Sequence, residues 1–181
     1  MKYKCLSLVI TAMSLLFLTS ATAASASSES GKEVKLRAEF YQNGLDLLLD
    51  KARRGNYADF YEDVLKFARY GEKYPQYLLG VMLLKGDGVQ QDVAQGIVWM
   101  RLSLEQKNTE WQRAYDKVVA AIPAEHLAAI EPMFELYKAR YGVDAQYMSC
   151  NNEKMESSSI RIHQCRKSLV MKEYYLYNSF E

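Results

Sequence analysis

The sequence predicts an all-α fold, and three observations between residues 75 and 104 support that prediction. Residues 77–84 are almost all apolar, too densely for a half-exposed strand, which indicates a mostly buried helix. Gly86 and Gly88 follow at once, and glycine ends helices because it adopts the left-handed conformation without a Cβ penalty. Asp92 then stands at an N-cap position. The apolar residues after it recur at three- and four-residue spacing: Ala94, Ile97, Val98 and Leu102.

Three small or apolar residues indicate how the two predicted helices pack together. Gly80 and Gly96 lie inside the two predicted helices, where each costs about 1 kcal/mol relative to alanine. We expect close approach of the two helix backbones to offset that cost. Val89 is the one apolar residue of the turn, and we expect it to lie beneath the turn.

These residues resemble the core signature of the Sel-one-like repeat (SLR), a relative of the tetratricopeptide repeat. The matching positions are Leu79, Gly80, Gly86, Gly88, Val89, Asp92 and Trp99. The chain departs from the family pattern at Pro75, Leu83, Gly96 and the pair Leu102 and Ser103. The resemblance implies a short right-handed α/α solenoid of helical hairpins that binds partners on a concave surface. The residues expected to face that surface are Tyr77, Leu78, Val81 and Lys85.

Helical patterns continue on both sides of the hairpin. Residues 60–71 resemble the second helix of a preceding repeat, and residues 46–55 a degenerate first helix. Residues 111–122 predict the first helix of a following pair, and residues 128–141 continue with apolar side chains at helical spacing. Stacked repeats contact only their neighbours, and about three are needed for stability. We therefore expect one repeat domain over residues 36–145.

The N-terminus has the features of a secretory signal peptide. Residues 1–23 begin with two lysines, continue with an apolar run over residues 6–18 and end in a small-residue cleavage motif at Ala23, with a second option at Ala26. The run is too short for a comfortable transmembrane span, so we expect no stable membrane insertion after cleavage. This predicts a bacterial protein of the periplasm or the exterior. Residues 24–35 are serine-rich and charged, which predicts a disordered linker.

The charge balance argues against nucleic acid as a partner. The chain has 23 basic and 22 acidic residues, and the predicted signal peptide removes two lysines and no acid. The mature chain is therefore nearly neutral, and no overall field draws it to an anionic polymer.

Two cysteines remain after cleavage, Cys150 and Cys165. In an oxidising compartment such a pair most simply forms a disulfide. Closing this loop stabilises a fold by about 3 kcal/mol in the chain-entropy model. We expect the disulfide to tether a C-terminal segment, residues 146–181, whose helix over residues 164–178 caps the solenoid.

No residue set predicts a catalytic, metal or cofactor site. His163 adds one ligand to the two cysteines, whereas structural zinc normally takes four. His126, the other histidine, lies in no recognisable hydrolase or protease motif. Tyrosines cluster at two places, near the hairpin and near the C-terminus, and either pack between helices or line a groove for peptide or glycan.

The sequence thus predicts a non-enzymatic helical-repeat protein that binds an unidentified protein or peptide. Two alternatives stay open: a periplasmic hydrolase acting on β-lactam or peptidoglycan, and an envelope-stability or secreted effector factor.

Overall fold

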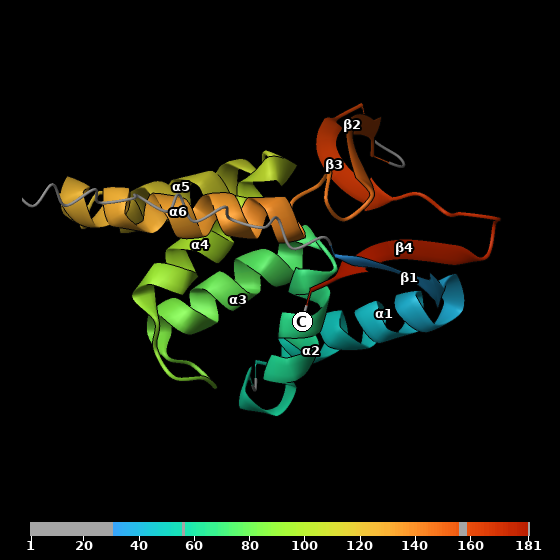
Figure 1. Ribbon diagram of the computed structural model, residues 1–181, viewed down its shortest axis with the longest axis horizontal. Coiled ribbons are helices and arrows are strands. Elements are labelled where there is room, and N and C mark those ends of the chain that lie inside the picture. Colours follow the sequence, from blue (N-terminus) through green and yellow to red (C-terminus); the bar gives the residue numbers. More distant parts are fainter. Residues whose placement is uncertain (1–30, 56, 156–158, 181) are drawn as a thin grey trace, which may run out of the picture.

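The computed structural model describes residues 31–55, 57–155 and 159–180 (Figure 1). The predicted signal peptide and the first part of the predicted linker lie outside these residues. The described elements follow in this order: β1 (Lys32–Arg37), α1 (Ala38–Arg54), η1 (Tyr57–Phe60), α2 (Tyr61–Arg69), α3 (Lys73–Lys85), α4 (Val93–Ser103), η2 (Leu104–Gln106), α5 (Thr109–Val119), α6 (Ala124–Tyr141), β2 (Met148–Lys154), β3 (Arg161–Lys167) and β4 (Tyr174–Ser179). None of the described helices is long and apolar enough to cross a membrane.

Helices α3 and α4 form the predicted hairpin at the centre of the molecule (Figure 1). Gly86 ends α3 in the left-handed conformation with φ of 71°, and its N–H donates to the carbonyl of Met82 at 2.8 Å. The carboxylate of Asp92 caps α4 by accepting the N–H of Gln95 at 2.9 Å. Val89 is partly buried and packs against the core. Local sequence therefore sets where each helix of this pair begins and ends.

The core lies where α1 and α2 meet this hairpin. Leu79 and Trp99, two residues of the repeat signature, are buried in it. The Trp99 ring stacks on Tyr141 from α6 at 5.2 Å between centroids. The other fully buried apolar residues of this core include Val64, Ala68 and Leu102.

Helices α5 and α6 extend the stack beyond α4, which packs against both of them. Pro123 precedes the first residue of α6, as expected for a proline at a helix start. In α5 no residue is buried, and in α6 only Phe134 and Tyr141 are. This end of the stack is consequently much less covered than the core.

The predicted all-α class is wrong in one respect, because two small antiparallel sheets accompany the helices (Figure 1). Strand β1 pairs with β4, with Val34 opposite Tyr177. Residues 32–35 of the predicted disordered linker thus lie in a paired strand. Val34 and Leu36 are partly buried and alternate with exposed residues, which is the period of a strand with one covered face.

The predicted C-terminal helix over residues 164–178 is likewise replaced by strands β3 and β4. Tyrosine favours strands, and alternate tyrosines of β4 point to one face. Tyr175 lies 4.9 Å from Tyr41 of α1 and Tyr177 lies 4.1 Å from Tyr70 after α2, ring centroid to centroid. The C-terminal tyrosines therefore pack against the helices as part of a sheet.

The predicted disulfide between Cys150 and Cys165 is present, but its place differs from the expectation. The two cysteines are directly opposed in the antiparallel pair of β2 and β3. The bond therefore fixes the register of this hairpin and does not tether a helix to the repeats.

Candidate functional site

A large apolar cavity lies between α4, α5 and α6. Its volume is about 620 Å³. Its lining residues are Ile97, Val98, Arg101, Tyr115, Val119, Leu127, Ala128, Ile130, Glu131 and Phe134. Helix α4 forms the floor, and α5 and α6 form the two walls.

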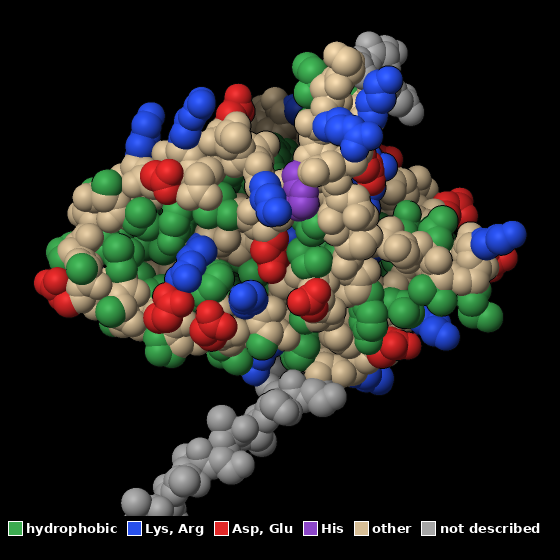
Figure 2. Space-filling model, turned by 90° about the horizontal axis from the view of Figure 1, so that it is seen from above, with side chains coloured by type: hydrophobic (Ala, Val, Ile, Leu, Met, Phe, Trp, Pro, Cys, Tyr) green, Lys and Arg blue, Asp and Glu red, His purple; other side chains and the backbone are tan. Residues whose placement is uncertain are grey.

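A second apolar cavity of about 370 Å³ adjoins the first, because Ile97 and Ile130 line both. It continues past the turn between α5 and α6, where Pro123 and His126 contribute to its wall. We call the two cavities together the α4–α6 groove. Figure 2 shows hydrophobic side chains gathered at this end of the molecule, at the left of the view, with charged side chains around them.

One ion pair stands at the rim of the α4–α6 groove. The Arg101 guanidinium donates two hydrogen bonds to the Glu131 carboxylate, at 2.6 and 3.1 Å. Arg101 also lies over the Phe134 ring, 3.7 Å from its centroid. The hydrogen bonds from Arg101 hold the pKa of Glu131 below its usual range. The guanidinium is thereby fixed against an apolar wall.

Further acidic residues surround this ion pair. Together with Glu131, the negative charge of Glu135 helps to raise the pKa of Arg101. Burial raises the pKa of the neighbouring Tyr115 hydroxyl, and the negative charge of Asp116 adds to that effect. Both carboxylates are exposed to solvent. Exposed Arg113, Lys117 and Lys138 stand on the same two helices, so the charges at this end of the protein are mixed.

The four residues predicted to bind a partner lie elsewhere, on α3, and none lines the α4–α6 groove. Tyr77 stacks on Trp111 of α5 at 5.0 Å between ring centroids. Leu78 is only 6% exposed and belongs to the core. Val81 is partly buried and Lys85 is exposed. Partner binding by these residues stays a prediction, although the burial of Leu78 removes it from any accessible surface.

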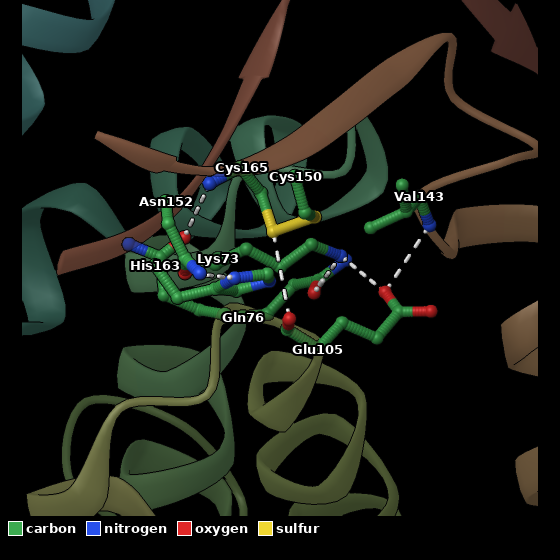
Figure 3. The surroundings of a disulfide bond; sticks show 9 residues. Lys73, Gln76, Glu105, Val143, Cys150, Asn152, His163 and Cys165 are labelled. Carbon is green, nitrogen blue, oxygen red and sulfur yellow. Dashed lines mark hydrogen bonds and ion pairs between the residues drawn. A yellow bond between two sulfur atoms is a disulfide. The ribbon is translucent and has the colours of Figure 1, made fainter. Parts of the chain in front are cut away.

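A buried polar network lies beside the disulfide between Cys150 and Cys165 (Figure 3). The Lys73 ammonium, on a side chain 2% exposed, donates to Glu105 at 2.7 Å and to Gln76 at 2.9 Å. The Gln76 amide donates in turn to the carbonyls of Ala68 and Tyr141. Burial lowers the pKa of Lys73, and the carboxylate of Glu105 opposes that effect.

This network also holds the disulfide hairpin against the helices. Glu105 accepts the backbone N–H of Val143 at 3.1 Å, and the Gln106 side chain accepts the backbone N–H of Cys165 at 3.1 Å. The β2–β3 hairpin is therefore anchored at η2 through hydrogen bonds.

The potential metal ligands of Cys150, His163 and Cys165 lie within 4.8 Å of one another (Figure 3). The two sulfurs are bonded to each other, so neither is a thiolate ligand. His163 contacts Asn152 through Nδ1 at 3.1 Å. In this oxidised state the cluster offers a metal one imidazole only.

A polar cavity of about 370 Å³ lies between α1 and the disulfide hairpin, lined in part by Tyr41, Glu72 and Lys167. The Tyr41 hydroxyl donates to Glu72, whose pKa burial raises. Lys167 donates to the carbonyls of Gln146 and of Leu176, the latter at 2.9 Å. Burial lowers the pKa of Lys167 to about 7. Every buried side-chain nitrogen and oxygen in the described part of the chain has a hydrogen-bond partner, as is usual in a folded protein.

The groove residues were missed by sequence reasoning, although a signal for them exists. Apolar residues recur at helical spacing on both walls: Tyr115, Val119, Leu127, Ile130 and Phe134. Such a pattern predicts burial, whereas here few residues of α5 and α6 approach each other and these side chains line a cavity instead.

The described residues form a mostly helical fold whose central α3–α4 hairpin carries the residues of the expected SLR signature, completed by two small sheets. No protein-family model matches the sequence, and no curated protein matches it. Among solved structures, the chain is similar to a protective antigen of uropathogenic Escherichia coli strains that displays an SLR fold. The identity is 20% and the TM-score 0.47, over 59% of this chain and 23% of that chain. The chain thus spans less than a quarter of the length of that protein.

Proposed function

We propose that this is an exported helical-repeat protein that binds a protein or peptide partner in the α4–α6 groove and catalyses no reaction. The observation that carries the proposal is the groove itself: a wide apolar cavity in which α5 contributes no buried residue. Apolar side chains that line an open groove gain free energy when a partner covers them. The nearly neutral charge of the mature chain supports a protein partner over nucleic acid.

Export is supported by two features of the chain. The first 23 residues have the pattern of a signal peptide, and a disulfide such as Cys150–Cys165 persists in oxidising compartments. Mass spectrometry of the protein from a periplasmic fraction should find an N-terminus at Ala24 or Ser27, the residues that follow the two predicted cleavage sites. Recovery of the intact chain from the cytoplasm would contradict export.

The partner site is testable by photocrosslinking in intact cells. A photoreactive phenylalanine analogue replaces Ala128, which is exposed and lines the groove. The matched control replaces Ala139, which is exposed on the same helix and lines neither cavity of the groove. We expect a discrete adduct from position 128 that is absent from position 139. Equal adducts from both positions, or none from position 128, would exclude the groove as the partner site.

The non-catalytic part of the proposal has a separate test. Purified protein should leave nitrocefin and muropeptides unchanged. Turnover of either substrate would establish the hydrolase alternative instead.

A further inference from the structure

The disulfide hairpin places three side chains of metal-binding type on one face of β2 and β3 (Figure 3). Successive side chains of a strand point to opposite faces, so His163 and Cys165, two positions apart on β3, share a face. Cys150 lies directly opposite Cys165 in the strand pair and therefore points to that face as well. The potential ligand atoms of these residues lie within 4.8 Å of one another. One metal ion between them can contact all three once the two sulfurs are no longer bonded to each other.

The pairing of β2 with β3 does not depend on the disulfide alone. The two strands are paired over their whole lengths. The Gln106 side chain accepts the backbone N–H of Cys165 at 3.1 Å, which holds β3 against η2. Arg166 of β3 also forms an ion pair with Glu153 of β2 at 3.3 Å. Because these contacts do not involve the sulfurs, the cysteines and the histidine stay on one face after reduction.

The two sulfurs differ in their access to a reductant. Cys150 is partly exposed, whereas Cys165 is only 6% exposed. A thiolate of an external dithiol can therefore attack the sulfur of Cys150 and release Cys165 as the leaving thiolate. The second thiol of the reductant then displaces Cys150. The dithiol is oxidised to a disulfide, and the protein gains two electrons and two protons as two thiols.

From this geometry we infer that the reduced hairpin binds a thiophilic divalent ion such as Zn²⁺ through Cys150, Cys165 and His163, and that the disulfide closes this site. Binding through two thiolates releases both thiol protons. Two thiolates and one imidazole form a ligand set known for zinc, in which water takes the fourth tetrahedral position. Structural zinc normally takes four protein ligands, so this set fits an exchangeable ion.

Asn152 supports the assignment of the imidazole. Its Oδ1 lies 3.1 Å from Nδ1 of His163. A metal-binding imidazole usually donates its other N–H to such an acceptor, which orients the ring and fixes its tautomer.

Cobalt titration tests the inference, because Co²⁺ occupies zinc sites and its thiolate complexes absorb light. The chain beginning at Ala24 is reduced with dithiothreitol, desalted without oxygen and titrated with Co²⁺. We expect one Co²⁺ per chain, with a thiolate-to-cobalt charge-transfer band and the visible bands of tetrahedral cobalt. Zn²⁺ should then displace the Co²⁺ and bleach both. The disulfide-bonded protein should give neither signal.

Two histidine variants locate the site. His163→Ala should weaken Co²⁺ binding to the reduced protein at least about tenfold, because it removes one of three ligands. His126→Ala is the matched control, since this other histidine is exposed on α6, and it should bind Co²⁺ as the parent does. Circular dichroism before titration shows whether each reduced protein is folded.

The other outcomes each overturn the inference. Equal binding by the oxidised and the reduced protein would place the metal elsewhere. Tight binding that His163→Ala leaves unchanged would mean that the thiolates act without the imidazole. A reduced parent that is folded and binds no Co²⁺, or one that loses its fold on reduction, would show that the hairpin does not hold the three ligands together.

Discussion

Gly80 and Gly96 face each other where α3 crosses α4, and they let the two backbones meet. A Cβ placed on Gly80 would lie 2.8 Å from the carbonyl oxygen of Gly96 and 2.8 Å from the backbone nitrogen of Met100. A Cβ on Gly96 would lie 3.0 Å from the carbonyl oxygen of Gly80. The close approach expected from the sequence is therefore real, and it explains why glycine stands inside both helices.

We predict that Gly80→Ala destabilises the protein, although alanine normally stabilises a helix interior by about 1 kcal/mol relative to glycine. The new methyl group meets backbone atoms that cannot rotate away, and overpacking of this kind costs about 1–3 kcal/mol. Urea unfolding measures the change in the free energy of unfolding.

Gly44→Ala is the matched control, since Gly44 also lies inside a helix. A Cβ there would approach only Phe67, at 3.1 Å from its ring edge, and that side chain can shift. We expect its effect to be within about 1 kcal/mol of zero. Equal losses in the two variants would show that the backbone contact is not the cause.

The ion pair between Lys73 and Glu105 gives a second prediction. Glu105→Ala leaves the buried Lys73 ammonium without its anionic partner and the Val143 N–H without its acceptor. Removing one partner of a buried pair costs about 3–5 kcal/mol. Because Glu105 is partly exposed, we expect the free energy of unfolding, measured in denaturant, to fall by about 3 kcal/mol.

The exposed ion pair of Arg101 and Glu131 serves as the control for the loss of stability expected from Glu105→Ala. Glu131→Ala should cost much less than Glu105→Ala, because water replaces the lost contact. A loss from Glu131→Ala as large as that from Glu105→Ala would contradict the role assigned to burial.

The central hairpin was predictable because its determinants are local. Gly86 and Asp92 mark the helix ends through bonds within a few residues of each, and the apolar spacing marks the covered faces. Strand β4 was not predictable in this way. Its partner β1 lies at the other end of the described chain, and residues 169–176 satisfy helical spacing as well as strand alternation.

The disulfide pairing could likewise be predicted from the sequence, whereas the groove could not. Pairing of Cys150 with Cys165 follows from counting the cysteines left after cleavage, whereas their position in a hairpin depends on strand register. The groove needs the placement of three helices relative to one another. A helical pattern fixes which side chains of α5 and α6 are apolar and says nothing of whether these helices touch.

We predict that the disulfide stabilises the folded protein by about 3 kcal/mol, since it closes a loop with a sequence separation of 15. The pair of substitutions Cys150→Ser and Cys165→Ser should lower the free energy of unfolding by that amount in the chain beginning at Ala24. Alkylation of the unreduced parent should add no mass. A mass increase without reductant would contradict the bond.

The lowered pKa of Lys167 predicts a pH dependence of stability. Its folded-state pKa is about 7, against an ordinary value of 10.5, because burial disfavours the ammonium. Between these values the unfolded chain binds more protons than the folded one, so the free energy of unfolding rises with pH. The contribution is at most about 1.4 kcal/mol per pH unit.

Lys167→Met should flatten this rise between about pH 7 and about pH 9, as followed by urea unfolding at several pH values. The lowered pKa of Lys73 contributes in the same direction, and because the charge of Lys73 also lowers the pKa of Lys167, the difference between the two slopes reports Lys167 together with its repulsion from Lys73. Lys117→Met, at an exposed position of α5, should retain the slope of the parent. If Lys167→Met and the parent show the same slope, the Lys167 ammonium keeps its ordinary pKa in the folded protein, and its contacts with the carbonyls of Gln146 and Leu176 offset its burial in full.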